Sequence, residues 1–437
     1  MFDRKYDAAV RELENRCSNE ITAAMQDGAA VTGDFGELMR RAWAVVDTSE
    51  QFAGAPQPLK LEVSRFIIDD LFQLGPLEAA LADPEVTEIM VNAPDKVFVE
   101  RHGTVQPTNI HFFDIPHIER VITRIAQGDN RRCDQQSPLC DCMLNRKGAP
   151  FDGSRVNATW MPISADSPTL TIRKFRNDSL DVAALIKSGS LDANMASLIE
   201  SLVKARCNVI FSGGTGTGKT TILNVASAYI PETERVITVE DTAELRLRQE
   251  NWVRHVARPA NTEGAGLITI RQLVKNTLRE RPDRIVVGEC RGAEAFDMLQ
   301  AMGSGHDGSL TTLHANEPRQ ALSRLMMLMQ QSEEGAHMPV SAIMQVITDA
   351  VDFVVQLKRY PDGSRKICEV MEVCGMQGDV PITAPIIKFV QDADAPDGTV
   401  QGVFLPTGNR FNERHRLQFA NAGVEIDARW FDSGRVW

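Results

Sequence analysis

The chain has 437 residues, of which 43% are hydrophobic and 24% are charged, and its formal net charge is −12. This length exceeds what one hydrophobic core usually organises and predicts two to three domains. The acidic balance argues against broad electrostatic binding to nucleic acid, which needs concentrated lysine and arginine, so we expect no direct nucleic-acid partner.

The sequence predicts a cytoplasmic protein. No run approaches the roughly 18 apolar residues of a membrane span. The N-terminal residues are charged and lack the apolar core of a signal peptide. Any association with a membrane is therefore expected to be peripheral and to depend on partner proteins.

Residues 1–58 contain two helical patterns and predict a variable helical appendage. From 59 to 176 a clear amphipathic helix is followed by strand-like segments and a further helix, which predicts a small α+β domain. In two of its strands the period-2 alternation places Arg155 and Arg173 opposite the apolar side chains. Taken alone, both arginines are solvated surface charges.

The eight cysteines are scattered, and three of them, Cys133, Cys140 and Cys142, lie close together in the sequence. A zinc or redox site would use these three. No C-x-x-C pair and no fourth ligand at a usual spacing accompanies them. Reduced, mostly buried thiols are therefore the better interpretation.

Residues 177–188 indicate a linker, and 189–437 form the next domain, with a variable tail from about residue 376. Apolar strands alternate with helices here, which predicts a mostly parallel α/β sheet. The expected buried strands are 209–211, 235–239, 284–287 and 309–313. A hairpin from 353 to 373 is expected to close one side of the sheet.

The first of these strands leads into the sequence Gly-x-x-x-x-Gly-Lys-Thr, the pattern of a phosphate-binding loop. Glycines let successive backbone N–H groups turn around an anion, and the helix that follows adds its N-terminal dipole. Lys219 is expected to reach the β- and γ-phosphates, and the Thr220 hydroxyl to hold Mg²⁺. The expected contacts to ATP come from Gly213, Gly214, Thr215, Gly216, Thr217, Gly218, Lys219, Thr220 and Thr221.

Polar residues follow the other strands at the edge where open α/β sheets bind ligands. Glu289 is the candidate for orienting the attacking water, because γ-phosphate hydrolysis needs a positioned water and neutralised charge. Its strand ends in Gly-Glu rather than in the usual Asp, which leaves a direct metal contact at that strand open.

Glu240 and Asp241 end another strand and are candidates for Mg²⁺, partly through water. Helix capping is the alternative role for Asp241. His314 and His306 are candidates for sensing the γ-phosphate, with a structural role as the alternative.

Together these residues resemble the secretion and pilus traffic ATPases of type II and type IV systems. Four boxes occur in order: 213–220, 239–245, 288–289 and 305–316. Further stretches make the chain most similar to the CpaF-type ATPases of tight-adherence pili, namely 152–156, 170–175, 278–285, 291–295 and 298–302.

The resemblance implies a RecA-like P-loop domain preceded by a PAS-like α+β domain, assembled as a homohexamer. It also implies ATP and Mg²⁺ as ligands, and inner-membrane platform proteins as partners. Glu289 would be the catalytic carboxylate, supported by Glu240, Asp241 and His314. Arg155 and Arg173 match arginines that reach the phosphates from the N-terminal domain, while Arg279 and Arg281 are weaker candidates for phosphate contacts.

The function that we expect is a hexameric ATPase motor that powers pilus assembly or secretion through the inner-membrane platform, with pilus retraction as a further task of the same motor. A type IV secretion or conjugation ATPase, which moves protein or DNA, is the alternative within the same class. A nucleotide-gated scaffold that assembles on ATP but scarcely hydrolyses it is the alternative from a different class.

Overall fold

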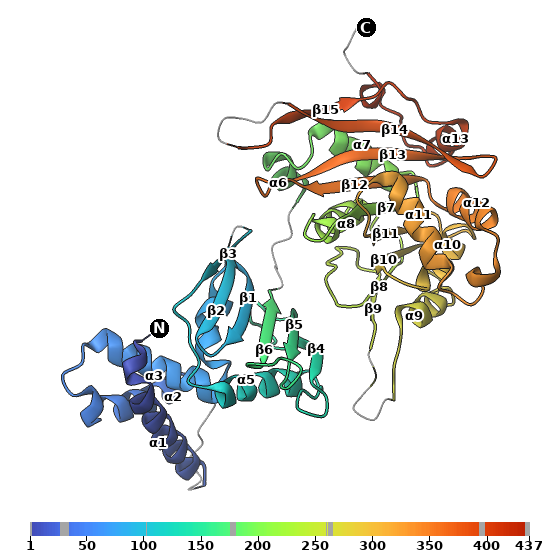
Figure 1. Ribbon diagram of the computed structural model, residues 1–437. Helices are drawn as coiled ribbons and strands as arrows, with labels where there is room; N and C mark the ends of the chain where they lie inside the picture. The colour runs from blue at the N-terminus through green and yellow to red at the C-terminus, as the bar shows by residue number, and fades with distance from the viewer. Residues whose placement is uncertain are drawn as a thin grey trace. The chain divides into compact units, whose positions relative to one another are not determined.

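The computed structural model describes residues 2–26, 35–101, 103–174, 181–258, 260, 265–392 and 398–432. The chain divides into two compact units, Met1–Asn177 and Asp178–Trp437 (Figure 1). The division falls at the start of the segment for which the sequence predicts a linker.

Three helices at the start of the first unit share one apolar core: α1 (Asp7–Gln26), α2 (Phe35–Asp47) and α3 (Gln57–Phe72). Val10, Val46 and Ile67, one from each helix, are fully buried in this core. The boundary expected after residue 58 therefore lies between helices that pack on one another, because α3 uses its apolar stripe to cover α1 and α2.

The rest of the first unit is an antiparallel sheet with helix α5 packed on it. In the described residues the sheet has six strands in the order β3-β2-β1-β6-β5-β4. The buried side chains of α5, including Ile118 and Ile122, share a core with the strands. The elements are α4 (Glu78–Ala82), α5 (Ile115–Gly128), β1 (Val86–Ala93), β2 (Lys96–Arg101), β3 (Thr104–Pro107), β4 (Leu139–Leu144), β5 (Ser154–Thr159) and β6 (Thr169–Arg173).

Cys133, Cys140 and Cys142 lie in this core as buried free thiols. No group of three or more histidine, cysteine, aspartate or glutamate residues suited to a metal ion occurs in the part of the chain that the structure describes. Nor is any helix within the described ranges long and apolar enough to cross a membrane.

The second unit is built on a mixed sheet. Nine strands are described, in the order β15-β14-β13-β12-β7-β11-β10-β8-β9. The strands from β12 to β9 pair in parallel, and β13, β14 and β15 add antiparallel neighbours on the other side of β12. They are β7 (Val209–Gly213), β8 (Val236–Glu240), β9 (Trp252–Val256), β10 (Arg284–Cys290), β11 (Leu310–Leu313), β12 (Phe353–Arg359), β13 (Arg365–Gln377), β14 (Val380–Gln391) and β15 (Gly402–Pro406).

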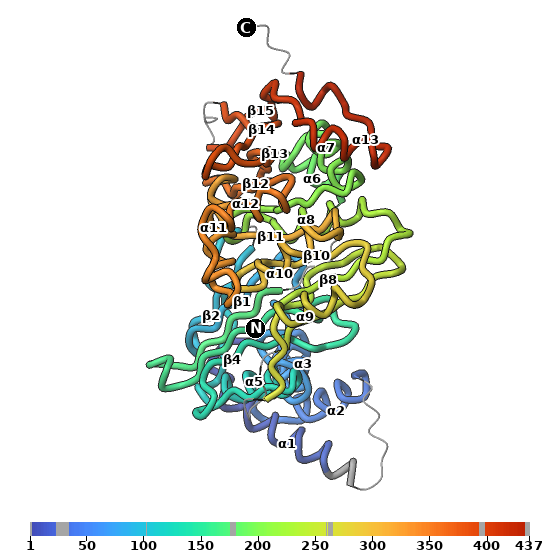
Figure 2. The backbone as a smooth tube through the Cα atoms, turned by 90° about the vertical axis from the view of Figure 1, so that its right-hand side faces the viewer, coloured from blue at the N-terminus to red at the C-terminus, as the bar shows by residue number. Residues whose placement is uncertain are grey.

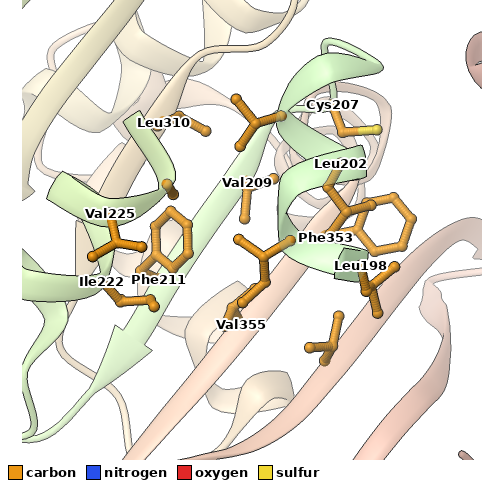
Figure 3. Packing of buried hydrophobic residues seen from close by; sticks show 14 of the residues in the cluster. Leu198, Leu202, Cys207, Val209, Phe211, Ile222, Val225, Leu310, Phe353 and Val355 are labelled. Carbon is orange, nitrogen blue, oxygen red and sulfur yellow. The ribbon is translucent and has the colours of Figure 1, made fainter. Parts of the chain in front are cut away.

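Helices cover both faces of this sheet, as Figure 2 shows with α11 and α12 on one side and α7 and α8 on the other. Figure 3 shows Val209 and Phe211 of β7 packed with side chains of α7, α8 and β12. The helices are α6 (Val182–Lys187), α7 (Ala193–Lys204), α8 (Lys219–Ser227), α9 (Ile270–Thr277), α10 (Glu294–Met302), α11 (Pro318–Met329), α12 (Val340–Ala350) and α13 (Glu413–Asn421).

The expectation that the 353–373 hairpin closes the sheet is wrong, because β14 and β15 continue it. Much of the tail from residue 376 thus belongs to the sheet, and α13 packs on the face that α7 and α8 cover. The alternation in β14 is interrupted by Pro381 and Pro385, so its sequence gives only a weak strand signal.

A buried charge cluster attaches α13 to the sheet. His415 Nδ1 lies 2.6 Å from Glu372 Oε1, and its Nε2 lies 3.1 Å from Asp352 Oδ1. Arg414 Nη2 contacts the same Asp352 oxygen at 2.6 Å. Burial opposes protonation of the ring, but the hydrogen bonds to the two carboxylates raise the pKa of His415 above its ordinary value.

We predict that His415→Gln destabilises this attachment by about 3 kcal/mol, because two buried carboxylates lose their shared cation. The raised pKa means that the stabilisation is fully present below the unfolded pKa of His and is lost as pH rises through the higher folded pKa. Amide hydrogen exchange in β12 and β13, measured from pH 6 to 8, reports both the loss of stability in the variant and the pH dependence in the unmodified protein.

Arg416→Gln is the matched control, since Arg416 is exposed on the same helix. Equal protection of β12 and β13 in His415→Gln and the unmodified protein would show that the cluster does not stabilise the sheet.

Candidate functional site

The phosphate loop follows the central strand β7, whose five residues are all buried. A Cβ on Gly213 would lie 2.6 Å from Thr217 Oγ1 and 2.8 Å from the Leu357 carbonyl oxygen, so only glycine fits there. Gly216 and Gly218 have φ of 71° and 92°, which glycine adopts without strain. The loop then enters α8, whose first turn has no side-chain cap.

Lys219 lies inside this loop. Its Nζ donates to the carbonyl oxygens of Gly213 at 3.0 Å and Gly214 at 2.9 Å, and it is 3.5 Å from His314 Nε2. Thr220 and Thr221 are half-buried in the first turn of α8, and Thr215 is exposed at the tip of the loop. The structure thus brings the lysine, both threonines and His314 to one place.

Glu289 lies near the end of β10 beside two basic side chains. Arg291 Nη2 lies 2.5 Å from Glu289 Oε2, and its Nη1 lies 3.5 Å from Asp241 Oδ2 at the end of β8. His314 Nε2 lies 2.8 Å from Glu289 Oε1. That contact lacks the geometry of a hydrogen bond, and Oε1 has no hydrogen-bond partner among the described residues.

The electrostatic surroundings favour the neutral form of the His314 ring. Burial and the Lys219 cation lower the pKa of the ring, and they outweigh the attraction of the Glu289 carboxylate. In the tautomer that carries its proton on Nδ1, a neutral ring can accept a hydrogen bond at Nε2 from Lys219. His314 therefore lies between the loop lysine and the candidate catalytic carboxylate.

Glu240 is nearly fully buried. It forms hydrogen bonds with the backbone of the acidic segment, residues 239–245. Its Oε1 accepts hydrogen bonds from the backbone N–H groups of Glu244 at 2.8 Å and Leu245 at 2.7 Å. Burial raises the pKa of Glu240 to about 7, against the opposing effect of these bonds. Its Oε2 lies 3.9 Å from Arg254 Nε, and neither atom has a hydrogen-bond partner in the described ranges.

This packing gives a physical reason for the Gly-Glu end of β10. A Cβ on Gly288 would lie 3.2 Å from Cγ of Glu240, which is closer than side-chain atoms ordinarily pack. A side chain at position 288 would therefore require Glu240 to shift by a few tenths of an ångström.

The remaining candidates lie apart from this cluster or in the other unit. His306 Nδ1 is buried without a hydrogen-bond partner among the described residues, and Arg279 and Arg281 are exposed beyond α9. Arg155 and Arg173 are directly opposite each other on β5 and β6 of the first unit. Neither is in the core of that unit, in agreement with the predicted alternation.

Sequence reasoning missed three arginines near the loop. Arg291 belongs to the 291–295 stretch, and its position two residues after Glu289 places both side chains at one strand end. Arg359 and Arg365 come from the β12–β13 hairpin, and Arg365 Nε donates to the Gly216 carbonyl oxygen at 2.8 Å. No local pattern indicates that contact, because 149 residues separate the two partners.

Comparison with known proteins gives consistent matches. Residues 70–377 match the family model described as "Type II/IV secretion system protein". A "Putative conjugal transfer protein" of Mycobacterium tuberculosis is 36% identical over 318 residues, covering 72% of this chain and 89% of that protein. "Probable conjugal transfer protein TrbB" of Sinorhizobium fredii is 33% identical over 300 residues, covering 67% and 85%.

Among solved structures, the ATPase DotB of Legionella pneumophila has a TM-score of 0.50 and 21% sequence identity. The match covers 70% of this chain and 80% of that one. At this identity the likeness concerns the fold, which in both units is a mixture of helices and sheet.

The site predicts opposite shifts of the His314 pKa in two variants. Lys219→Met removes the cation that disfavours ring protonation and is expected to raise this pKa, whereas Glu289→Gln removes the favourable carboxylate and is expected to lower it further. Histidine-selective ¹³C labelling and NMR titration of the nucleotide-free protein measure both shifts. The pKa of His415, which Asp352 and Glu372 determine, is the internal control.

Shifts of the same sign in the two variants would contradict the arrangement of His314 between Lys219 and Glu289.

Proposed function

Because this chain belongs to the type II/IV secretion system protein family, and is therefore an ATP hydrolase of secretion systems, we propose that it powers macromolecular transfer through a type IV secretion or conjugation system. The names of its relatives support this choice of system. The single observation behind the chemistry is that Glu289, His314 and Lys219 meet at the carboxyl ends of neighbouring strands.

In the proposed reaction the loop N–H groups and Lys219 bind the phosphates of ATP, and Glu289 orients the attacking water. Glu289 is suited to this task because its Oε1 has no hydrogen-bond partner in the described chain, while Arg291 holds its Oε2. His314 contacts both Glu289 and Lys219, so displacement of the lysine by a γ-phosphate would change the surroundings of the ring. This is the proposed route by which nucleotide state reaches the rest of the domain.

The oxygen donors at the site fit Mg²⁺, which prefers hydroxyl, carboxylate and water ligands. The Thr220 hydroxyl and Asp241 would hold the ion, partly through water, and the ion would neutralise phosphate charge. Glu240 fits less well, since its Oε1 already accepts two backbone N–H groups and only Oε2 could serve. Its proposed role is to position the acidic segment, and through that segment Asp241.

Arg155 and Arg173 are the proposed link between ATP and the first unit. They are adjacent across β5 and β6, and neither lies in the core of the unit. Two guanidinium groups on directly paired residues of neighbouring strands can bind the same phosphate chain. In the proposed cycle ATP draws the first unit onto the second through these arginines, and hydrolysis and release reopen the site.

We further propose that a homohexameric ring repeats this closure around its subunits. The ring would act on inner-membrane platform proteins from the cytoplasmic side, with peripheral attachment through those partners and no direct nucleic-acid contact. The RecA-like and PAS-like assignments of the two domains belong to the same proposal, which rests on the family motifs.

Assembly of a tight-adherence pilus is the second candidate, and the motifs shared with CpaF-type ATPases favour it. Neighbouring genes distinguish the two candidates: prepilin and platform genes would favour the pilus, whereas a channel and a relaxase would favour conjugation.

We predict that Glu289→Gln lowers kcat for ATP by about 100-fold or more, because the water loses its orienting carboxylate, while ATP still binds. Steady-state hydrolysis and calorimetric titration with ATP test the two parts. Glu333→Gln, an exposed carboxylate in the same unit, is the control with unchanged kcat. Light scattering in each nucleotide state reports the mass of the assembly.

Hexamers without turnover in either protein, even with the cytoplasmic domains of platform proteins added, would replace the motor with a nucleotide-gated scaffold.

We also predict that Arg155→Ala combined with Arg173→Ala lowers kcat by about 10³-fold, as expected when arginines that stabilise transition-state charge are removed. Lys96→Ala is the matched control, because Lys96 is an exposed cation on another strand of the same sheet. Turnover that survives the double substitution would rule out closure through these arginines.

A further inference from the structure

The hairpin of β12 and β13 runs directly beside the phosphate loop. Strand β12 pairs in parallel with β7, and Leu357 is opposite Gly213 at the end of that pairing. The Leu357 carbonyl oxygen would lie 2.8 Å from a Cβ on Gly213, so the two backbones approach too closely for any side chain at position 213. The hairpin therefore has a fixed position relative to the loop within this unit.

Two arginines of the hairpin lie over the tip of the loop. Arg359 and Arg365 are directly opposite each other in the β12–β13 register. Arg365 Nε donates to the Gly216 carbonyl oxygen at 2.8 Å. Arg359 Nη1 would lie 3.6 Å from a Cβ on Gly216, and Arg365 Cδ would lie 3.7 Å from a Cβ on Gly218.

The bond from Arg365 fixes the orientation of a peptide unit in the loop. In a planar trans peptide the carbonyl oxygen and the following N–H point in opposite directions. Holding the Gly216 oxygen toward the hairpin therefore directs the Thr217 N–H away from it. A phosphate loop depends on such N–H groups pointing together at one anion.

The charges of the pair point to an anion as well. Like charges directly opposite on neighbouring strands repel each other, and both arginines are exposed at the rim of the loop. Guanidinium groups bind phosphate through charge-assisted hydrogen bonds, so both side chains are suited to a polyphosphate bound at the loop. The hairpin thus adds two cations to Lys219 within a single unit of the chain.

We propose that Arg359 and Arg365 form an additional phosphate-binding element for the nucleotide at this loop. Arg365 is a positioning residue that orients the Gly216–Thr217 peptide, and Arg359 contacts the phosphate chain of the bound nucleotide. The proposal rests on ATP binding at the loop. It adds two residues that lie outside the phosphate loop (213–220), the acidic segment (239–245) and the histidine segment (305–316).

The test compares Arg365→Met, Arg365→Lys and Arg359→Met, which keep an unbranched aliphatic stem. Calorimetric titrations use ATP and inorganic pyrophosphate, both with Mg²⁺. We expect Arg365→Met and Arg359→Met each to raise Kd about tenfold for both ligands, as the loss of a hydrogen bond to a charged group implies. KM for ATP should rise by a similar factor while kcat changes less, and Arg365→Lys should recover part of the affinity.

Arg410→Met is the control, because Arg410 is an exposed arginine elsewhere in the same unit and should leave both affinities unchanged. Unchanged hydrogen exchange in β12 and β13 shows that the hairpin still folds in each variant. Unchanged Kd values in Arg359→Met and Arg365→Met would overturn the proposal. So would weaker binding of ATP with normal binding of pyrophosphate, since the arginines would then act on the nucleoside.

Glu289→Gln distinguishes a failure of the proposed ATPase chemistry from a failure of the proposed phosphate binding by the hairpin. If that variant loses turnover while both hairpin variants bind pyrophosphate normally, the motor chemistry stands and only the role of the hairpin fails.

Discussion

The close packing around the end of β7 is the constraint on which the site depends. The strand lies between β11 and β12, and its last residue has space only for a hydrogen atom on the side of Thr217 and Leu357. The loop that follows is therefore held between fixed neighbours rather than left to fluctuate. A rigid loop can direct several N–H groups at one anion without an ordering cost at each binding event.

The same sheet edge gathers charges that balance one another. Glu289 has Arg291 at one oxygen and the His314 ring beside the other, while Lys219 lies near the same ring nitrogen, Nε2. The proposed role of His314 as a reporter of nucleotide state rests on these two contacts, which arise because β7, β10 and β11 end at one edge.

The C-terminal part of the chain contributes more to this site than its sequence indicates. Strands β13 to β15 extend the sheet, and the His415 cluster holds α13 against it. These additions support β12, the strand that contacts the loop directly. The strand that carries Arg359 is therefore supported on one side by β7 and on the other by this distant segment.

The sequence by itself determined the phosphate loop, the buried strands around it and the strand-end positions of Glu240, Glu289 and His314, because these follow from short motifs and local alternation. It also placed Arg155 and Arg173 opposite the core of their domain. Only the tertiary structure decided that Glu240 directs one oxygen to backbone N–H groups, that β14 and β15 join the sheet, and that Arg365 binds the loop. Those features depend on packing and pairing between residues far apart in the chain, for which a local pattern holds no signal.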